Sequence, residues 1–229
     1  MTRLRQNMLR TIAVIMLVCL TKISDAKPAL TIVALGDSTT AGTPQFQSPL
    51  EAPPDGSGNP ESQYAYWMMQ AHPEWTVINQ GINGQRSDEI LARFDSSVLK
   101  HHPQIVVVLA GVNDLYQGYR PETVIKNLKA IYARAAAAQI RVVACTIIPY
   151  NRMSAEVETR MRQVNEWIAS YSTSNGISFC DLFEAVENPD RPGTLVSTPD
   201  GLHPDITGYR KMGEALTAVI ERDFPKSAG

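Results

Sequence analysis

The residues of this chain whose types and spacing could support chemistry lie in four short polar segments. The first segment holds Ser38, and the last holds Asp200 three positions before His203. A serine hydroxyl becomes an effective nucleophile when a neighbouring base takes its proton, and histidine is the natural base near neutral pH. An aspartate three residues earlier can lie on the same side of a turn and fix the tautomer of the imidazole ring. These residue types are therefore suited to nucleophilic attack on a carbonyl group.

Two glycine-rich segments, residues 79–84 and 111–114, lie between the serine and the histidine. Taken singly, each of the four segments is compatible with an ordinary turn. Residues 36–38 could end a strand, Asn113 could begin a helix, and Asp200 could open a turn with the glycine that follows it. Chemistry is favoured because the segments combine one serine, one asparagine and an Asp-x-x-His pair.

Five short apolar runs supply the elements that must position these segments. They cover residues 30–35, 76–78, 105–110, 141–148 and 177–182. Each run is too short for a helix of usual length, and most are apolar on both faces, as in a buried parallel sheet. Helical patterns separate the runs. This alternation predicts an α/β fold with three layers, a flavodoxin-like doubly wound sheet of five mainly parallel strands. Ligands bind at the carboxyl ends of such strands, where the polar segments lie.

The ends of the helices are also indicated by the sequence. Ser87 is predicted to cap one helix, and Pro121 to open a second that runs through residue 138. Ser154 is predicted to cap a third helix, which stops at Gly176, and residues 206–224 form a closing amphipathic helix.

Residues 43–63 interrupt this alternation directly after the serine segment. They include five prolines and two glycines, which predict a loop without regular structure. Because the loop begins beside Ser38, it is well placed to form a wall or lid of a substrate pocket; a surface loop without that role is the alternative. No internal repeat is present, so we expect a single domain over residues 27–229 that contains this insertion.

With all four segments in this order, the sequence resembles the SGNH/GDSL hydrolases, a family of esterases, thioesterases and lysophospholipases. The family is named after a serine, a glycine, an asparagine and a histidine in four separate blocks. Ser38 matches the first block, Gly84 the second, Asn113 the third, and Asp200 with His203 the last. The resemblance extends from residue 30 to about residue 224. It implies a carboxylic ester hydrolase with Ser38, Asp200 and His203 as its catalytic residues.

The resemblance also implies how the oxyanion of the tetrahedral intermediate is stabilised. Its donors would be the backbone N–H groups of Ser38 and Gly84 and the side-chain amide of Asn113. Such a donor contributes about 2.7–4 kcal/mol to lowering the barrier in other enzymes. A glycine without Cβ would let the backbone of residue 84 approach the reacting carbonyl. Asp37 and Asp114 are interpreted as structural supports.

Three classes of function remain open at this stage. The first is a serine esterase, acting either on short acyl groups of sugars and small alcohols or on longer chains of lysophospholipids and thioesters. The second is a flavodoxin-like module that binds a phosphate or nucleotide in the loop at residues 38–40. The third is a non-catalytic SGNH-like domain that binds glycans. Asp200 and His203 have no purpose in the second class, and the intact Ser38 argues against the third.

Polar-tipped aromatic residues are expected near the site and favour a small ester substrate. Tyr116 and Tyr150 follow the third and fourth apolar runs and are predicted to bind the substrate. No cofactor is implied. A metal site is not expected either, since His101 and His102 point in different directions on one helix and lack a carboxylate-rich spacing around them.

The N-terminus resembles an export signal. Residues 1–26 combine three arginines, an apolar run over residues 11–20, and small residues before a cleavage site that would leave Lys27 first. Ten apolar residues are too few to span a hydrocarbon core that needs roughly 20, although an uncleaved interfacial anchor is an alternative. We therefore expect a secreted or periplasmic protein without stable membrane insertion after the leader is removed.

Composition and cysteine use add two further expectations. The net charge of −2 and the lack of a basic block argue against nucleic-acid binding. Cys145 and Cys180 lie in apolar runs and are predicted to be buried free thiols, although export would also permit a disulfide. The sequence leaves the oligomeric state open.

Overall fold

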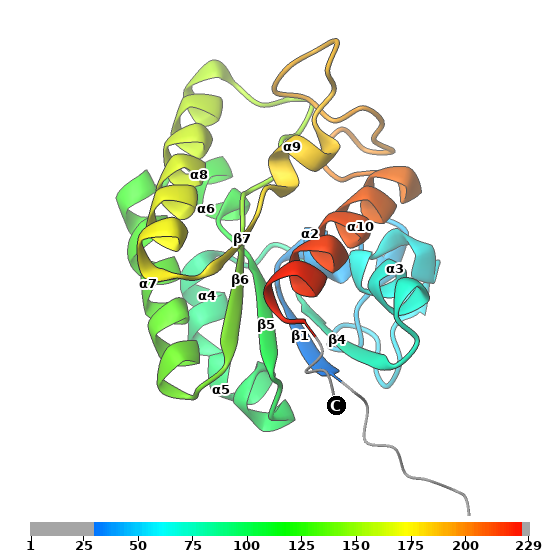
Figure 1. Cartoon of the computed structure of the whole chain (residues 1–229). Helices are drawn as coiled ribbons and strands as arrows, with labels where there is room; N and C mark the ends of the chain where they lie inside the picture. Colours follow the sequence, from blue (N-terminus) through cyan, green and yellow to red (C-terminus); the bar gives the residue numbers. More distant parts are fainter. Residues whose placement is uncertain (1–29, 226–229) are drawn as a thin grey trace, which may run out of the picture.

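A five-stranded parallel sheet forms the centre of the protein, which we describe from a computed structural model (Figure 1). The structure describes residues 30–225, so the predicted leader lies outside the described residues. The strand order is β4-β1-β5-β6-β7, and every neighbouring pair is parallel. The strands are β1 (Leu30–Gly36), β4 (Trp75–Gly81), β5 (Ile105–Leu109), β6 (Arg141–Cys145) and β7 (Ser178–Cys180). The predicted fold class is confirmed, and each of the five predicted apolar runs overlaps one of these strands.

Helices cover both faces of this sheet and complete the three predicted layers (Figure 1). Alternate residues of β1 point to opposite faces: Val33 and Leu35 join one core cluster, and Ile32 and Ala34 join the other. The first face packs against α4 (Ser87–Ala92), α5 (Phe94–Ser97), α7 (Pro121–Ala137) and α8 (Ala155–Asn175). The second packs against α3 (Tyr64–Ala71), α9 (Leu182–Val186) and α10 (Ile206–Asp223). Short helical segments complete the chain: α2 (Ser38–Ala41), α6 (Val112–Tyr116), η1 (Pro60–Ser62) and η2 (Leu99–His101).

The fourth apolar run, residues 141–148, is only partly strand. β6 ends at Cys145, and beyond it the side chain of Asn165 takes over the role of a neighbouring strand. It accepts a hydrogen bond from the N–H of Ile147 at 2.8 Å and donates one to the carbonyl of the same residue at 2.9 Å. Because one side chain satisfies both backbone groups, the chain can leave the sheet here and lead Ile148 and Tyr150 toward the site.

Two of the three predicted helix starts agree with the structure. Pro121 is the first residue of α7, and the hydroxyl of Ser154 accepts a hydrogen bond from the N–H of Val157 at the start of α8. The prediction that Ser87 caps α4 is wrong, because Arg86 occupies the cap position and Ser87 is the first helical residue. The hydroxyl and N–H of Ser87 both donate to Asp114 instead.

The proline-rich insertion, residues 43–63, has more regular structure than predicted. It contains a small antiparallel pair, β2 (Phe46–Gln47) with β3 (Ser57–Gly58), followed by the turn η1. Cys145 and Cys180 are register partners on β6 and β7, and both are buried free thiols, as expected. Within residues 30–225, no helix is both long enough and apolar enough to cross a membrane.

Candidate active site

The nucleophile candidate lies at the carboxyl end of the central strand β1. Ser38 is the first residue of the short helix α2, and the side chain of Asp37 caps this helix by accepting a hydrogen bond from the N–H of Thr39 at 3.0 Å. Ser38 is 8% exposed. The turn therefore holds its hydroxyl at the sheet edge, where ligands bind in doubly wound folds.

Ser38, His203 and Asp200 form a continuous chain of hydrogen bonds. Nε2 of His203 lies 2.8 Å from Oγ of Ser38, although the two residues are 165 positions apart in the sequence. Nδ1 of His203 lies 2.7 Å from Oδ2 of Asp200. This arrangement can move a proton from the serine hydroxyl to the imidazole ring and hold the ring in one orientation.

The carboxylate of Asp200 is held in its charged form. Burial raises the pKa of Asp200, but hydrogen bonds from the His203 ring and from the N–H groups of His203 and Leu202 outweigh burial and lower this pKa to about 2. A carboxylate that remains ionised can stabilise an imidazolium beside it throughout the neutral pH range.

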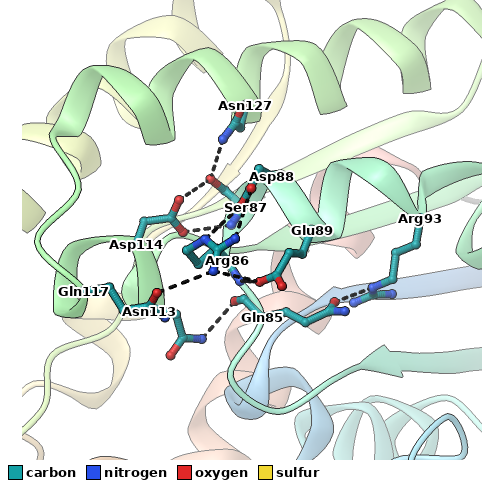
Figure 2. Close-up of polar contacts among 10 residues, drawn as sticks. All are labelled: Gln85, Arg86, Ser87, Asp88, Glu89, Arg93, Asn113, Asp114, Gln117 and Asn127. Carbon is teal, nitrogen blue, oxygen red and sulfur yellow. Dashed lines mark hydrogen bonds and ion pairs between the residues drawn. The ribbon is translucent and has the colours of Figure 1, made fainter.

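Gly84 and Asn113 line the same pocket as Ser38. The side-chain amide of Asn113 donates a hydrogen bond to the carbonyl of Gln85 at 2.9 Å (Figure 2). An amide nitrogen carries two hydrogens, and within residues 30–225 the second has no hydrogen-bond acceptor. Gly84 has a φ of +73°, a conformation that glycine adopts easily, and an added Cβ would meet no heavy atom within 4 Å. In this structure the turn geometry, rather than the room needed by a Cβ, explains the glycine.

A pocket of about 290 Å³ opens beside these groups. Its walls are mostly apolar, and the two tyrosines predicted to bind substrate both line it. Tyr150 is 5% exposed and Tyr116 is 64% exposed, and their rings meet edge to face with centroids 6.2 Å apart. The remaining apolar lining comes from Val112, Ile148 and Leu202. Six of the seven predicted site residues thus line one pocket, and the seventh, Asp200, lies behind His203.

Comparison with known families identifies the chain. The sequence profile of the GDSL-like Lipase/Acylhydrolase family matches residues 34–211, which contain all of these site residues. The chain belongs to this family. This match agrees with the resemblance of its four motif segments to the SGNH/GDSL hydrolases.

Several known proteins are similar to the chain. It is 29% identical over 126 residues to an arylesterase of Vibrio mimicus, covering 53% of this chain and 55% of the relative. It is 29% identical over 117 residues to a thioesterase 1/protease 1/lysophospholipase L1 of Escherichia coli K12, with 49% of each covered. The chain thus spans about half the length of these curated relatives. A solved lipolytic protein of the G-D-S-L family from Desulfitobacterium hafniense DCB-2 is 25% identical with a TM-score of 0.70, covering 83% of this chain and 99% of that one.

Asp37 and Asp114 have the supporting positions expected in this GDSL-like fold. Asp114 accepts hydrogen bonds from the N–H and hydroxyl of Ser87, and Asn127 donates to the same hydroxyl, so the second and third blocks are tied together (Figure 2). Burial raises the pKa of Asp37 to about 7; the N–H of Thr39 opposes this shift and Asp114 adds to it.

The insertion does not form a wall of the pocket, contrary to the sequence-based prediction. Residues 43–63 are all described, and none of them lines it. The insertion instead braces the turn that carries Gly84. Glu51 accepts a hydrogen bond from the N–H of Asn83 at 2.7 Å, Thr43 donates to the side chain of Asn83, and Ser48 donates to the carbonyl of Gly81 at 2.6 Å. The sequence contains no motif that points to these contacts.

Proposed function

We propose that this protein is an exported esterase that cleaves carboxylic esters through an acyl-enzyme formed on Ser38. The observation that carries the proposal is the unbroken hydrogen-bonded chain from Ser38 Oγ through both ring nitrogens of His203 to Asp200. A glycan-binding or nucleotide-binding module has no need of these three groups at such distances. The family match supports the ester-cleaving reaction class.

The contacts of these residues suggest how the steps proceed. Nε2 of His203 takes the proton as Ser38 Oγ attacks the carbonyl carbon of the ester, and the carbonyl oxygen becomes an oxyanion. The N–H groups of Ser38 and Gly84 and the second amide hydrogen of Asn113 are the proposed donors to that oxyanion. The imidazolium then protonates the leaving alkoxide. Water attacks the acyl group in the reverse sequence and restores Ser38.

The pocket favours a small substrate. Binding sites for drug-sized ligands typically enclose about 300–1,000 Å³, and this pocket lies at the lower end of that range. We therefore propose short acyl esters of small aromatic alcohols or sugars, which the rings and hydroxyls of Tyr116 and Tyr150 can contact. Hydrolysis of longer acyl esters or thioesters is the second candidate, because one curated relative is named as a thioesterase and lysophospholipase.

The proposal of export rests on the predicted leader sequence. The arginines, the short apolar run and the small residues before Lys27 support a signal peptide over residues 1–26 and a periplasmic or secreted destination. Intact-mass analysis of protein recovered outside the cytoplasm tests this, with Lys27 expected as the first residue. A membrane-bound product that retains Met1 would contradict it.

Replacement of the nucleophile tests the proposed function. Ser38→Ala should abolish hydrolysis of p-nitrophenyl acetate and labelling by a fluorophosphonate, while circular dichroism and the melting temperature stay near those of the unaltered protein. Ser170→Ala, which removes an exposed hydroxyl on α8, is the control and should keep both activities. Full hydrolysis by the Ser38→Ala protein would reject the mechanism.

A further inference from the structure

The three proposed oxyanion donors come from three separate parts of the fold. Ser38 follows β1, Gly84 lies in the turn after β4, and Asn113 lies at the start of α6 after β5. A tetrahedral intermediate requires all three donors to converge to within a few tenths of an ångström, since a small misplacement can cost a large factor in rate. Something must therefore fix the spacing between these three loops.

Arg93 contacts two of these loops with one guanidinium group. Its Nη2 donates to the carbonyl of Gly36 at 2.8 Å, two residues before Ser38. Its Nε donates to the side-chain oxygen of Gln85 at 2.6 Å, one residue after Gly84 (Figure 2). The planar guanidinium holds both acceptors in a fixed relation, which a flexible ammonium cannot do.

The third donor is connected through the same residue. The backbone carbonyl of Gln85 accepts the hydrogen bond from the Asn113 amide at 2.9 Å (Figure 2). Gln85 thus receives Arg93 on its side chain and Asn113 on its backbone. Through these contacts, Arg93 lies within two hydrogen bonds of all three segments that carry the donors.

We propose that Arg93 is a positioning residue of this esterase: it sets the spacing between the nucleophile turn and the loop of Gly84 and Gln85, and through Gln85 it orients the amide of Asn113. This inference rests on the proposed function of Ser38, Gly84 and Asn113. Arg93 itself does not line the pocket, so it acts through these residues and not on the substrate.

The environment of Arg93 is consistent with this role. Burial lowers the pKa of Arg93 to about 10, while the nearby Asp37 opposes the shift, so the guanidinium remains charged at neutral pH. A charged donor that is partly removed from water makes strong hydrogen bonds to neutral oxygens. The third bond of Arg93, from Nη1 to the hydroxyl of Ser97 at 3.0 Å, ties it to the last residue of α5.

The matched control is Arg134, a second arginine that binds the same α4–α5 segment from outside. It donates to the carbonyl of Leu91 at 3.2 Å and pairs with Asp95, and it contacts neither loop. Arg134→Met should therefore affect the stability of this segment without altering the geometry of the donors.

The experiment compares Arg93→Met, Arg93→Lys, Gln85→Ala and Arg134→Met in the full-length protein, with p-nitrophenyl acetate as substrate. Arg93→Met should lower kcat by about 10- to 100-fold with little change in KM, because the loss is of transition-state stabilisation. It should weaken inhibition by phenylboronic acid, whose tetrahedral adduct on Ser38 also needs the donors. Arg93→Lys and Gln85→Ala should fall between Arg93→Met and the unaltered protein. Arg134→Met should keep its kcat.

A double-mutant cycle with Asn113→Ala separates positioning from a general structural role. If Arg93 acts through Gln85 on Asn113, the two losses in kcat should combine to less than their product. If Arg93→Met does not fold, the same cycle with Gln85→Ala provides the test. Unchanged kcat in a folded Arg93→Met protein, or fully multiplicative losses, would overturn the proposal. Failure of the proposed function would be visible separately, as activity that survives Ser38→Ala.

Discussion

Asp200 holds His203 at two places, its ring and its backbone. Oδ2 lies 2.7 Å from Nδ1 of the imidazole, and Oδ1 accepts a hydrogen bond from the N–H of His203 at 2.8 Å. One carboxylate therefore fixes both the backbone position of the histidine and the orientation of its ring. This double contact is possible because the two residues are three positions apart in a tight turn, where Gly201 has a φ of +82°.

Replacement of this carboxylate should affect the proton transfer more than the fold. Asp200→Asn should lower kcat by about 10³–10⁴-fold, because an amide supports the wrong tautomer and does not stabilise the imidazolium. Since the pKa of Asp200 is about 2, its own titration should not shape the pH–rate curve above pH 4. Steady-state kinetics from pH 4 to 9 checks both points. A fall in kcat of the unaltered protein above pH 4 that follows the protonation of Asp200 would contradict the assignment.

Removal of the Asn113 amide should act on turnover. Asn113→Ala is expected to lower kcat by roughly 10²–10³-fold and to leave KM nearly unchanged, because its free hydrogen is proposed to act on the developing oxyanion. Asn127→Ala is the control: its amide donates to the hydroxyl of Ser87 and does not line the pocket. A rise in KM alone would instead make Asn113 a ground-state contact.

Asp37 should make stability depend on pH. Its pKa is raised from 3.8 to about 7, so the folded state favours the neutral acid. The stabilisation is therefore complete below about pH 4 and is lost as pH rises through 7. The free energy of unfolding, measured with urea, should fall between pH 5 and pH 8 in the unaltered protein. Asp37→Asn should remove part of this fall. Asp55→Asn, an exposed control, should leave that loss unchanged.

Tyr150 should influence which esters are preferred. Its ring is 5% exposed and lines the pocket, and among residues 30–225 its hydroxyl has no hydrogen-bond partner. Tyr150→Phe should lower kcat/KM for acetylated sugars by several-fold relative to p-nitrophenyl acetate, because only the sugar offers hydroxyls to bind. Equal losses of kcat/KM on both substrates would show that the hydroxyl of Tyr150 does not discriminate between them. Tyr116→Phe, at the exposed rim, serves as the comparison.

Glu51 should affect the rate with every substrate to the same degree. It binds the N–H of Asn83 beside Gly84 but does not line the pocket. Glu51→Ala should therefore lower kcat for a series of p-nitrophenyl esters by a common factor, without changing their order. Glu61→Ala, in the same insertion, is the control. A changed order along the acyl-chain series would restore the idea that the insertion selects substrate.

The fold could be predicted from the sequence, and so could the meeting of the candidate site residues at one sheet edge, because both depend on local patterns. Apolar runs mark buried strands, and the polar segments that follow them must meet at one sheet edge. The supports of the site were not predictable in this way. Arg93, Gln85 and Glu51 occur in segments that read as ordinary helix or loop. The contact of Glu51 with Asn83 joins positions 32 residues apart, and that of Arg93 with Gly36 joins positions 57 residues apart.

Competition between hydrogen-bond acceptors explains why the prediction that Ser87 caps a helix was wrong. Ser87 has the residue type of an N-cap, but Asp114 takes both its hydroxyl and its N–H. A buried carboxylate needs such donors more than the helix end does, since an unpaired buried charge is costly. The sequence showed the serine but not this competing acceptor, 27 positions away.

The strand order separates the two halves of the proposed chemistry. The three adjacent strands β4, β1 and β5 carry Gly84, Ser38 and Asn113, whereas Asp200 and His203 lie outside the sheet, on the segment before α10. That segment is tied down by a few backbone contacts, such as those from Asn151 to Gly201 and from Asp205 to Ser197. Local fraying there would withdraw the base while the nucleophile and its donors stayed assembled. We therefore expect thermal inactivation to precede melting of the sheet, with amide exchange fastest at residues 197–205.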